Sequence, residues 1–175
     1  MSYSTVRLVK PSIEHREEYL SFYKEWKASG EEMVPWVIER DPTDFGAMVA
    51  FLENHEKGID LPEGWVPSST FWLVDESGKM IGAVNIRHRL TEYLLRAGGH
   101  IGMGVRPSER RRGHAKKMLA LALAEAKGLG TERALLVCDA DNLASERTIV
   151  RCGGVRDDDF VEADGTVLKR FWIET

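Results

Sequence analysis

Two helical patterns of apolar residues follow a short strand in the first third of the chain. The strand is expected around Val6 to Val9, and Pro11 and Ser12 then open a helix that ends at Gly30. Its apolar residues recur at i, i+3, i+4 and i+7, and they are Tyr19, Phe22, Tyr23 and Trp26. The same spacing predicts a second helix between Asp44 and Gly58, with apolar residues Phe45, Met48, Val49 and Leu52.

The rest of the chain alternates apolar runs with helical segments. Residues 70–75 and 80–90 flank a turn at 76–79 and predict a β-hairpin, preceded by a loop over 58–69. Residues 91–97 predict a short helical or irregular link. The order continues with strand 99–105, helix 113–127, strand 134–139, helix 143–152 and a hairpin that turns at Asp164 and Gly165. This order predicts an α/β fold with helices on the faces of a mixed sheet, antiparallel early and parallel where helix 113–127 crosses over.

Length and charge narrow the class of protein. The 175 residues correspond to one domain, 1–175, whose core needs neither disulfides nor a structural metal. A formal net charge of −4 does not suit a general binder of nucleic-acid backbones, so any anion site must be local. The chain shows neither a stretch long enough for a membrane helix nor the apolar core of a signal peptide. We therefore expect a cytoplasmic protein without membrane contact.

The cysteines and histidines do not have the spacing of a metal site. Cys138 and Cys152 form no CxxC pair, which favours buried inert thiols over a zinc site or a disulfide. The histidines at 15, 55 and 114 also lack ligand spacing, so no metal is expected.

The segment 105–117, VRPSERRRGHAKK, combines a strand end, a turn with three arginines and a helix start at Gly113. Unpaired N–H groups and a partial positive charge at a helix start can hold a pyrophosphate, and a glycine allows close approach. The alternative is a solvated basic helix start. The segment lacks the GK[ST] of a Walker A motif, and Pro107 stands where a dinucleotide fingerprint needs its third glycine.

One face of strand 99–105 is nearly free of side chains. His100, Gly102 and Gly104 share that face, whereas Ile101, Met103 and Val105 point the other way. Glycines inside a strand often mark the close approach of a ligand or another backbone. Both a ligand and a closely packed helix are compatible with this face.

At this point the sequence resembles the GCN5-related N-acetyltransferase (GNAT) family. The family's acetyl-CoA signature Q/R-x-x-G-x-G/A is matched by residues 110–115, and the preceding Val-x-Pro by residues 105–107. A strand at 135–138, Asn142-Leu143-Ala144-Ser145 and Gly153-Gly154 follow in the family's order, so the resemblance covers about residues 70–155. The Asn-x-x-Ser form is most similar to the branch with ribosomal-protein N-terminal and spermidine acetyltransferases.

The resemblance implies a single-domain GNAT-like fold with a mostly antiparallel twisted sheet and a splayed parallel strand pair. It implies that acetyl-CoA is the co-substrate, with its pyrophosphate on residues 111–115 and its pantetheine beside strand 101–105. The residues implied in its binding are Met103, Gly104, Val105, Arg110, Arg111, Arg112, Gly113, His114, Ala115, Asn142 and Ser145.

The catalytic residues of the family are matched less well. Ile149 stands where many members have a tyrosine acid, and Gly102 where they have an acidic residue on the strand. Ser145 is then the candidate acid, although a hydroxyl in a first helical turn can instead bond to backbone. The candidate bases are His100 and Glu92, with His88 as a third. Glu92 can equally be a solvated carboxylate, and His88 can bind the acceptor or pack.

We therefore expect an N-acetyltransferase that moves the acetyl group to a primary amine by direct attack on the thioester, with the oxyanion stabilised by N–H groups near Gly104 and Val105. The acceptor is a small molecule, an amino acid or a protein N-terminus. The alternative is an acyl-CoA-binding sensor without transfer activity, and a nucleic-acid patch at RRRGHAKK is disfavoured by the acidic total. A homodimer is left open.

Two further patterns have structural interpretations. Asp157, Asp158 and Asp159 predict a solvated turn. Trp65, Phe71 and Trp72 can edge an acceptor pocket, but core packing is favoured.

Overall fold

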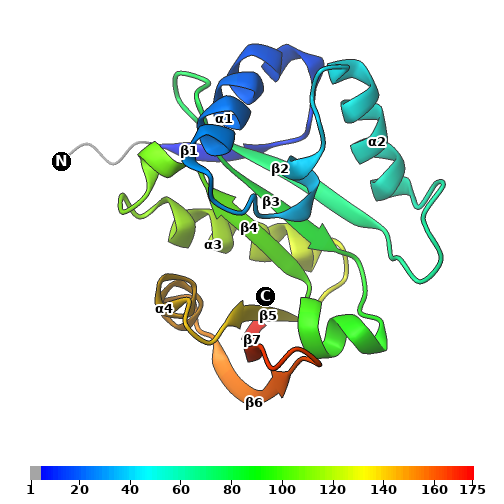
Figure 1. Ribbon diagram of the computed structural model, residues 1–175, viewed down its shortest axis with the longest axis vertical. Coiled ribbons are helices and arrows are strands. Elements are labelled where there is room, and N and C mark those ends of the chain that lie inside the picture. Colours follow the sequence, from blue (N-terminus) through cyan, green and yellow to red (C-terminus); the bar gives the residue numbers. More distant parts are fainter. Residues whose placement is uncertain (1–4) are drawn as a thin grey trace.

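Seven strands form two sheets in the computed structural model, which describes residues 5–175 (Figure 1). The first sheet has the order β1 (Val6–Val9), β2 (Ser68–Asp75), β3 (Met80–Arg87) and β4 (Ile101–Val105), and all its pairs are antiparallel. The second has the order β5 (Arg133–Asp139), β7 (Val167–Glu174) and β6 (Val155–Val161), also antiparallel. β4 and β5 are edge strands that face each other, as expected for a splayed pair.

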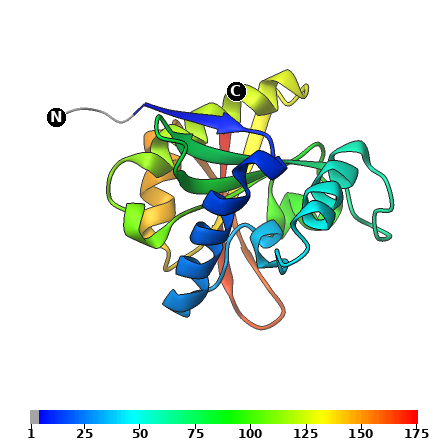
Figure 2. The same cartoon turned by 90° about the horizontal axis from the view of Figure 1, so that it is seen from above.

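Helices cover both faces of the first sheet. α1 (Arg16–Ser29) and α2 (Phe45–Lys57) lie on one face, as the view from above shows (Figure 2). α3 (His114–Gly128) lies on the other face and connects β4 to β5, and α4 (Leu143–Arg151) follows β5. Single turns of 3₁₀ helix span Ile13–His15, Trp36–Glu39 and Pro107–Glu109, and a π-helix spans Leu94–Gly98.

The sheet separates two apolar cores. Alternate residues of β2, β3 and β4 pack with α3 around Leu73, Val84 and Met118. The opposite face packs α1 and α2 around Trp72, where Tyr19, Phe22 and Trp26 are also buried. The periodic apolar residues of both predicted helices therefore point into this second core.

The helix ends follow the local chemistry predicted from the sequence. Gly30 and Gly58 take the left-handed conformation at the ends of α1 and α2, with φ of 70° and 72°. The Asp44 carboxylate accepts a hydrogen bond from the Ala47 N–H at 3.0 Å and caps α2. The predicted ends at Gly30 and Gly58 and the start after Asp44 are confirmed, whereas Ser12 caps a 3₁₀ turn and α1 itself begins only at Arg16.

Some local expectations were wrong. The acidic run 157–159 lies in β6 rather than in a turn, because Asp157 accepts a hydrogen bond from Trp172 Nε1 at 2.8 Å and the ladder shifts between Asp157 and Phe160. The 3₁₀ turn at Trp36–Glu39 was not predicted. Phe71 and Trp72 belong to the two cores, whereas Trp65 is 47% exposed and contacts Trp36 edge to face.

Candidate active site

β4 and β5 diverge from a single point of contact. There the His100 N–H donates to the Leu135 carbonyl at 2.7 Å, and the Leu135 N–H donates to His100 Nδ1 at 2.8 Å. Past this point, no backbone hydrogen bond joins the two strands in residues 5–175. The splay therefore leaves backbone groups available on both sides of a gap.

Strand alternation decides which groups face this gap. Arg106 N–H donates to the Ile81 carbonyl at 2.8 Å, so even-numbered residues of β4 turn their backbone toward β3. The N–H groups of Met103 and Val105 consequently point into the gap, whereas that of Gly104 points toward β3. This direction disfavours the Gly104 N–H as an oxyanion donor and leaves those of Met103 and Val105 available, and the oxyanion role itself stays a prediction.

The chain between β4 and α3 makes a tight turn that ends at an uncapped helix. Arg111 and Gly113 take positive φ of 61° and 82°. Among the described residues, no side chain caps the N-terminus of α3. Free N–H groups at a helix start bind anions. The predicted phosphate cradle has a suitable geometry, and the binding itself stays a prediction.

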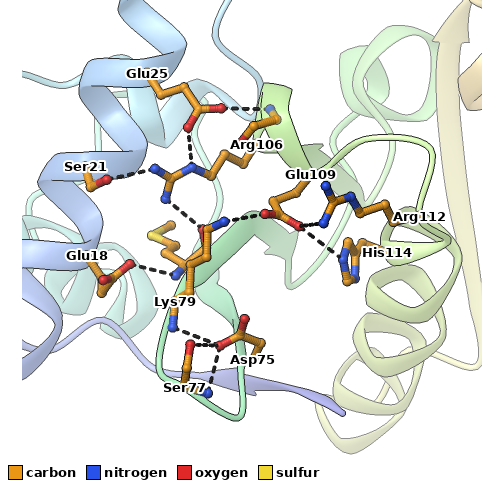
Figure 3. Close-up of polar contacts among 12 residues, drawn as sticks. Glu18, Ser21, Glu25, Asp75, Ser77, Lys79, Arg106, Glu109, Arg112 and His114 are labelled. Atoms are coloured by element: carbon orange, nitrogen blue, oxygen red, sulfur yellow. Dashed lines mark hydrogen bonds and ion pairs between the residues drawn. The ribbon is translucent and has the colours of Figure 1, made fainter. Parts of the chain in front are cut away.

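A buried carboxylate holds this turn in place (Figure 3). Glu109 is 6% exposed and forms an ion pair with Lys79, which comes from the turn between β2 and β3. Its second oxygen lies 3.4 Å from Arg112 Nη1 and 3.6 Å from His114 Nε2. The β2–β3 hairpin and the start of α3 are thereby tied together.

A second network fixes the end of β4 against α1 (Figure 3). Buried Arg106 bonds through Nε to Glu25 at 2.5 Å and through Nη2 to Ser21 Oγ at 2.7 Å, and the Ser108 N–H donates to the other Glu25 oxygen at 2.7 Å. Burial acts to raise the pKa of Glu25, but the bonds from Ser108 and Arg106 outweigh it and lower the pKa. Glu25 therefore stays ionised beneath the turn.

The three arginines of the turn have different surroundings. Arg110 pairs with Glu31 at 2.6 Å, donates to the Val105 carbonyl at 3.1 Å and lies over the Trp26 ring. Its side chain is thus held against α1, which disfavours the predicted contact with acetyl-CoA. Arg112 turns to Glu109, whereas the exposed Arg111 makes no ion pair in the described part of the chain. Arg111 is the arginine left available for an anion.

The acetyltransferase (GNAT) domain model matches residues 5–155 of the chain. The chain belongs to the GNAT family. It is therefore an N-acetyltransferase that uses acetyl-CoA.

Solved structures share the fold at low sequence identity. The acetyltransferase that modifies the N-terminal serine of ribosomal protein L7/L12 in Salmonella typhimurium has a TM-score of 0.68 at 14% identity, with 99% of this chain and 96% of that chain covered. A mutant of the spermidine N-acetyltransferase SpeG from Vibrio cholerae has a TM-score of 0.63 at 17% identity, with coverage of 97% and 94%. The microcin C7 self-immunity acetyltransferase MccE, solved with acetyl-CoA and AMP, has a TM-score of 0.69 at 15% identity, with coverage of 97% and 92%. A comparison with curated protein sequences finds no match.

In this GNAT enzyme His100 connects the two sheets. Its Nδ1 accepts the Leu135 N–H, so the neutral ring carries its proton on Nε2 and has no free lone pair. Burial and then repulsion from Arg87 lower the pKa of His100 below its ordinary value. Acting as a base would require His100 to give up its bond to Leu135, so this geometry favours a positioning role. The base role stays a prediction.

Replacing His100 by glutamine should reveal this structural bond in the pH dependence of stability. Because its pKa is lower in the folded state, the unfolded chain takes up the proton first. The stabilising contribution of neutral His100 is therefore complete above about pH 6.5 and is lost as the pH falls below it. Urea unfolding from pH 8 to 5 should show a shallower acid loss for His100→Gln than for wild type. An identical acid loss in both proteins would contradict this assignment.

The other candidate bases lie in ordinary surroundings. The Glu92 side chain is 82% exposed and pairs with Arg96 at 2.8 Å, which is the arrangement of a solvated carboxylate. His88 Nε2 lies 2.8 Å from Ser69 Oγ, and burial lowers the pKa of His88. Both residues lie in the connection between β3, which ends at Arg87, and β4, which begins at Ile101.

Protein covers the glycine face of β4 tightly at Gly104 but not at Gly102. A Cβ on Gly104 would lie 2.0 Å from the Val34 carbonyl oxygen and 2.5 Å from the Trp26 ring. A Cβ on Gly102 would meet Pro35 Cβ at 3.4 Å, an ordinary contact. The ligand interpretation of this face is therefore wrong at Gly104, because close packing of α1 and the segment after it requires that glycine.

Asn142 and Ser145 lie at the start of α4. Asn142 Oδ1 accepts the Ser145 N–H at 3.1 Å and caps the helix. The Ser145 hydroxyl is partly exposed and has no hydrogen bond within residues 5–175, so it is free to act on a ligand. Ile149 is 3% exposed in the first core, which explains an apolar residue at the position of the family's tyrosine.

Replacing Asn142 by alanine should lower the free energy of unfolding by about 1 kcal/mol, because the cap of α4 is lost. If the amide also contacts acetyl-CoA, the KM for acetyl-CoA should rise as well, which loss of a remote cap would not cause. Asp44→Ala, which removes the cap of α2, is the matched control. Chemical unfolding and steady-state kinetics on both variants measure the two effects. Equal KM values in both variants would assign Asn142 to capping alone.

The remaining groups are inert. Burial raises the pKa of the Cys138 thiol to about 11 and also raises that of Cys152, consistent with unreactive thiols. Over residues 5–175, no group of three or more His, Cys, Asp or Glu residues could hold a metal ion. In the same range, no helix combines the length and apolar character needed to cross a membrane.

Proposed function

We propose that this enzyme moves the acetyl group of acetyl-CoA to a primary amine by direct attack of the neutral amine on the thioester. The observation that carries the proposal is the open edge of β4, which leads directly into the uncapped start of α3. The two features together offer hydrogen bonds to an extended amide-containing chain and to a pyrophosphate at its end.

The residues divide the work along this path. The pyrophosphate binds to the N–H groups of residues 111–115, with Arg111 as the available cation. The pantetheine lies in the gap along β4, so the thioester carbonyl reaches the N–H groups of Met103 and Val105. These groups are directed by the strand and need no rearrangement to stabilise an oxyanion.

The transfer forms a C–N bond and breaks the C–S bond of the thioester. An alkyl ammonium has a pKa of about 10.4 and must first lose a proton, which passes to a base or to water. The leaving thiolate takes a proton from the Ser145 hydroxyl or from solvent. His100 holds the start of β4 against β5 through its two hydrogen bonds with Leu135 and so fixes where the gap begins.

The test is release of free thiol from acetyl-CoA in the presence of a panel of primary amines. We expect thiol release that depends on the amine and a stoichiometric N-acetylated product by mass spectrometry. Tight binding of CoA without thiol release for any amine would instead support the acyl-CoA sensor. His100→Gln at one fixed acceptor tests the base, because a rate with an unchanged acidic limb assigns proton removal to water or another group.

A further inference from the structure

Polar side chains gather on the α1–α2 face of the first sheet, next to the open edge of β4. Residues directly opposite on neighbouring strands share a face, and the register places Asn85 of β3 between Thr70 of β2 and Gly102 of β4. Ala83 packs with α1 and α2, so Asn85 and Arg87, at two-residue steps from it, point to that same side.

The amide of Asn85 is buried and only half satisfied. Asn85 is 1% exposed, and its Nδ2 donates to Ser68 Oγ at 3.0 Å and to Thr70 Oγ1 at 3.1 Å. Its Oδ1 has no hydrogen-bond partner. A buried carbonyl oxygen without a donor is unfavourable and rare in folded proteins, so it calls for a donor that arrives with a ligand.

Arg87, two residues further along, carries a charge without a counterion. Its Nη1 donates to the carbonyls of Gly98 and Gly99, both at 3.1 Å. No carboxylate lies within ion-pair distance of Arg87 in residues 5–175, and the side chain is partly buried, which desolvates the guanidinium and lowers its pKa. A desolvated guanidinium held only by carbonyls retains its attraction for an anion.

Asn85 and Arg87 lie on the side of the sheet opposite to the start of α3, where the pyrophosphate is proposed to bind. α3 and its uncapped start lie on the opposite face of the sheet from α1 and α2 (Figure 1), so the phosphates and the acceptor reach the gap from different sides. Asn85 is one strand spacing, about 4.8 Å, from β4. The β4 residue directly opposite Asn85 is Gly102, where an added Cβ would lie 3.4 Å from Pro35 Cβ. The absence of a side chain there leaves the amide next to the reacting edge.

We propose that Asn85 and Arg87 form the acceptor subsite and that the acceptor carries a carboxylate beside its primary amine, as an α-amino acid does. The amine N–H donates to Asn85 Oδ1, and the carboxylate pairs with Arg87. A polyamine fits poorly, because Arg87 repels a second positive charge. The inference rests on the proposed transfer to an amine and adds the class of acceptor.

The charge of Arg87 is tested with L-alanine and L-alaninamide as acceptors. In Arg87→Met, the kcat/KM for L-alanine divided by that for L-alaninamide should be at least 10-fold lower than in wild type. Arg87→Lys keeps a positive charge and should retain part of the preference for L-alanine. Arg89→Met, an exposed residue near the end of the same strand, is the matched control and should leave the ratio unchanged. Comparing ratios between proteins removes the difference in amine pKa of the two acceptors. An unchanged ratio in Arg87→Met, or a wild-type preference for spermidine over L-alanine, would overturn the proposal.

The amide is tested with Asn85→Leu, which fills similar volume without an oxygen. We expect kcat/KM for L-alanine to fall at least 10-fold while the KM for acetyl-CoA stays near wild type. The Tm should also fall, because leucine removes the two hydrogen bonds that Asn85 Nδ2 donates to Ser68 and Thr70. Asn85→Asp restores an acceptor oxygen and should recover part of the activity, and Asn54→Leu on α2 is the control. A loss of Tm in Asn85→Leu with unchanged kinetics would assign the amide to the fold and overturn its role.

Failure of this inference is distinguishable from failure of the proposed function. If the wild-type enzyme acetylates amines without regard to a neighbouring carboxylate, the subsite is wrong and the transfer reaction stands. If no amine in the panel releases thiol from acetyl-CoA, the transfer reaction is wrong and the subsite falls with it.

Discussion

Replacing Gly104 by alanine is expected to lower the free energy of unfolding by about 3 kcal/mol. The added Cβ would lie 2.0 Å from the Val34 carbonyl oxygen, and this neighbour is backbone that cannot rotate away. The segment after α1 would have to move off β4. Chemical unfolding of the variant measures the loss.

Gly102→Ala is the matched control on the same face of the same strand. Its Cβ would make only a contact of 3.4 Å with Pro35 Cβ, so we expect stability within about 1 kcal/mol of wild type. Similar stability losses in the two variants would show that the strand, rather than the covering segment, requires the glycines.

Gly113→Val should weaken CoA binding about 100-fold, which corresponds to about 2.8 kcal/mol. Gly113 has a φ of 82° at the start of α3, and a Cβ there would meet nothing within 4 Å. The side chain would therefore project into the space where a pyrophosphate approaches the free N–H groups, and the helix start would also shift to relieve a conformation that valine avoids. Calorimetric titration with CoA measures the affinity.

Gly130→Val separates backbone strain from loss of the site. Gly130 also has a positive φ, 93°, a Cβ added there would meet nothing within 4 Å, and the residue lies past the far end of α3. It should lose stability without losing CoA affinity. Wild-type affinity in a folded Gly113→Val protein would place the pyrophosphate elsewhere.

The elements that the sequence predicted well are those whose signals are local. Tyr19, Phe22 and Trp26 repeat at helical spacing. Gly30 ends the helix because a glycine, which has no Cβ, takes the left-handed conformation without strain. The turn at residues 110–115 was predicted for the same reason, because a glycine directly before a helix is a signal within a few residues. The acidic run 157–159 misled because a partner strand, through Trp172, decides its conformation.

The candidate site was predictable only where the backbone alone defines it. His100 has the chemistry of a base, but its Nδ1 accepts a hydrogen bond from the Leu135 N–H. A local sequence pattern cannot predict a hydrogen-bond partner 35 residues away. Arg110 was expected at the phosphate, yet Trp26 of α1 and Glu31, just after that helix, hold its side chain. Asn85 and Arg87 were not singled out at all, because a polar residue on a strand shows its unmet hydrogen bond only when its neighbours are known.

By itself, the sequence determined the order of elements, the family and the turn that leads into α3, because spacing, glycines and caps act within a few residues. The tertiary structure decided which side of β4 faces the gap, which arginine is free and which glycine is covered. Those outcomes depend on contacts between segments far apart in the chain, such as Val34 on Gly104 and Leu135 on His100. These contacts stabilise the protein only after the two sheets and the helices between them have packed together.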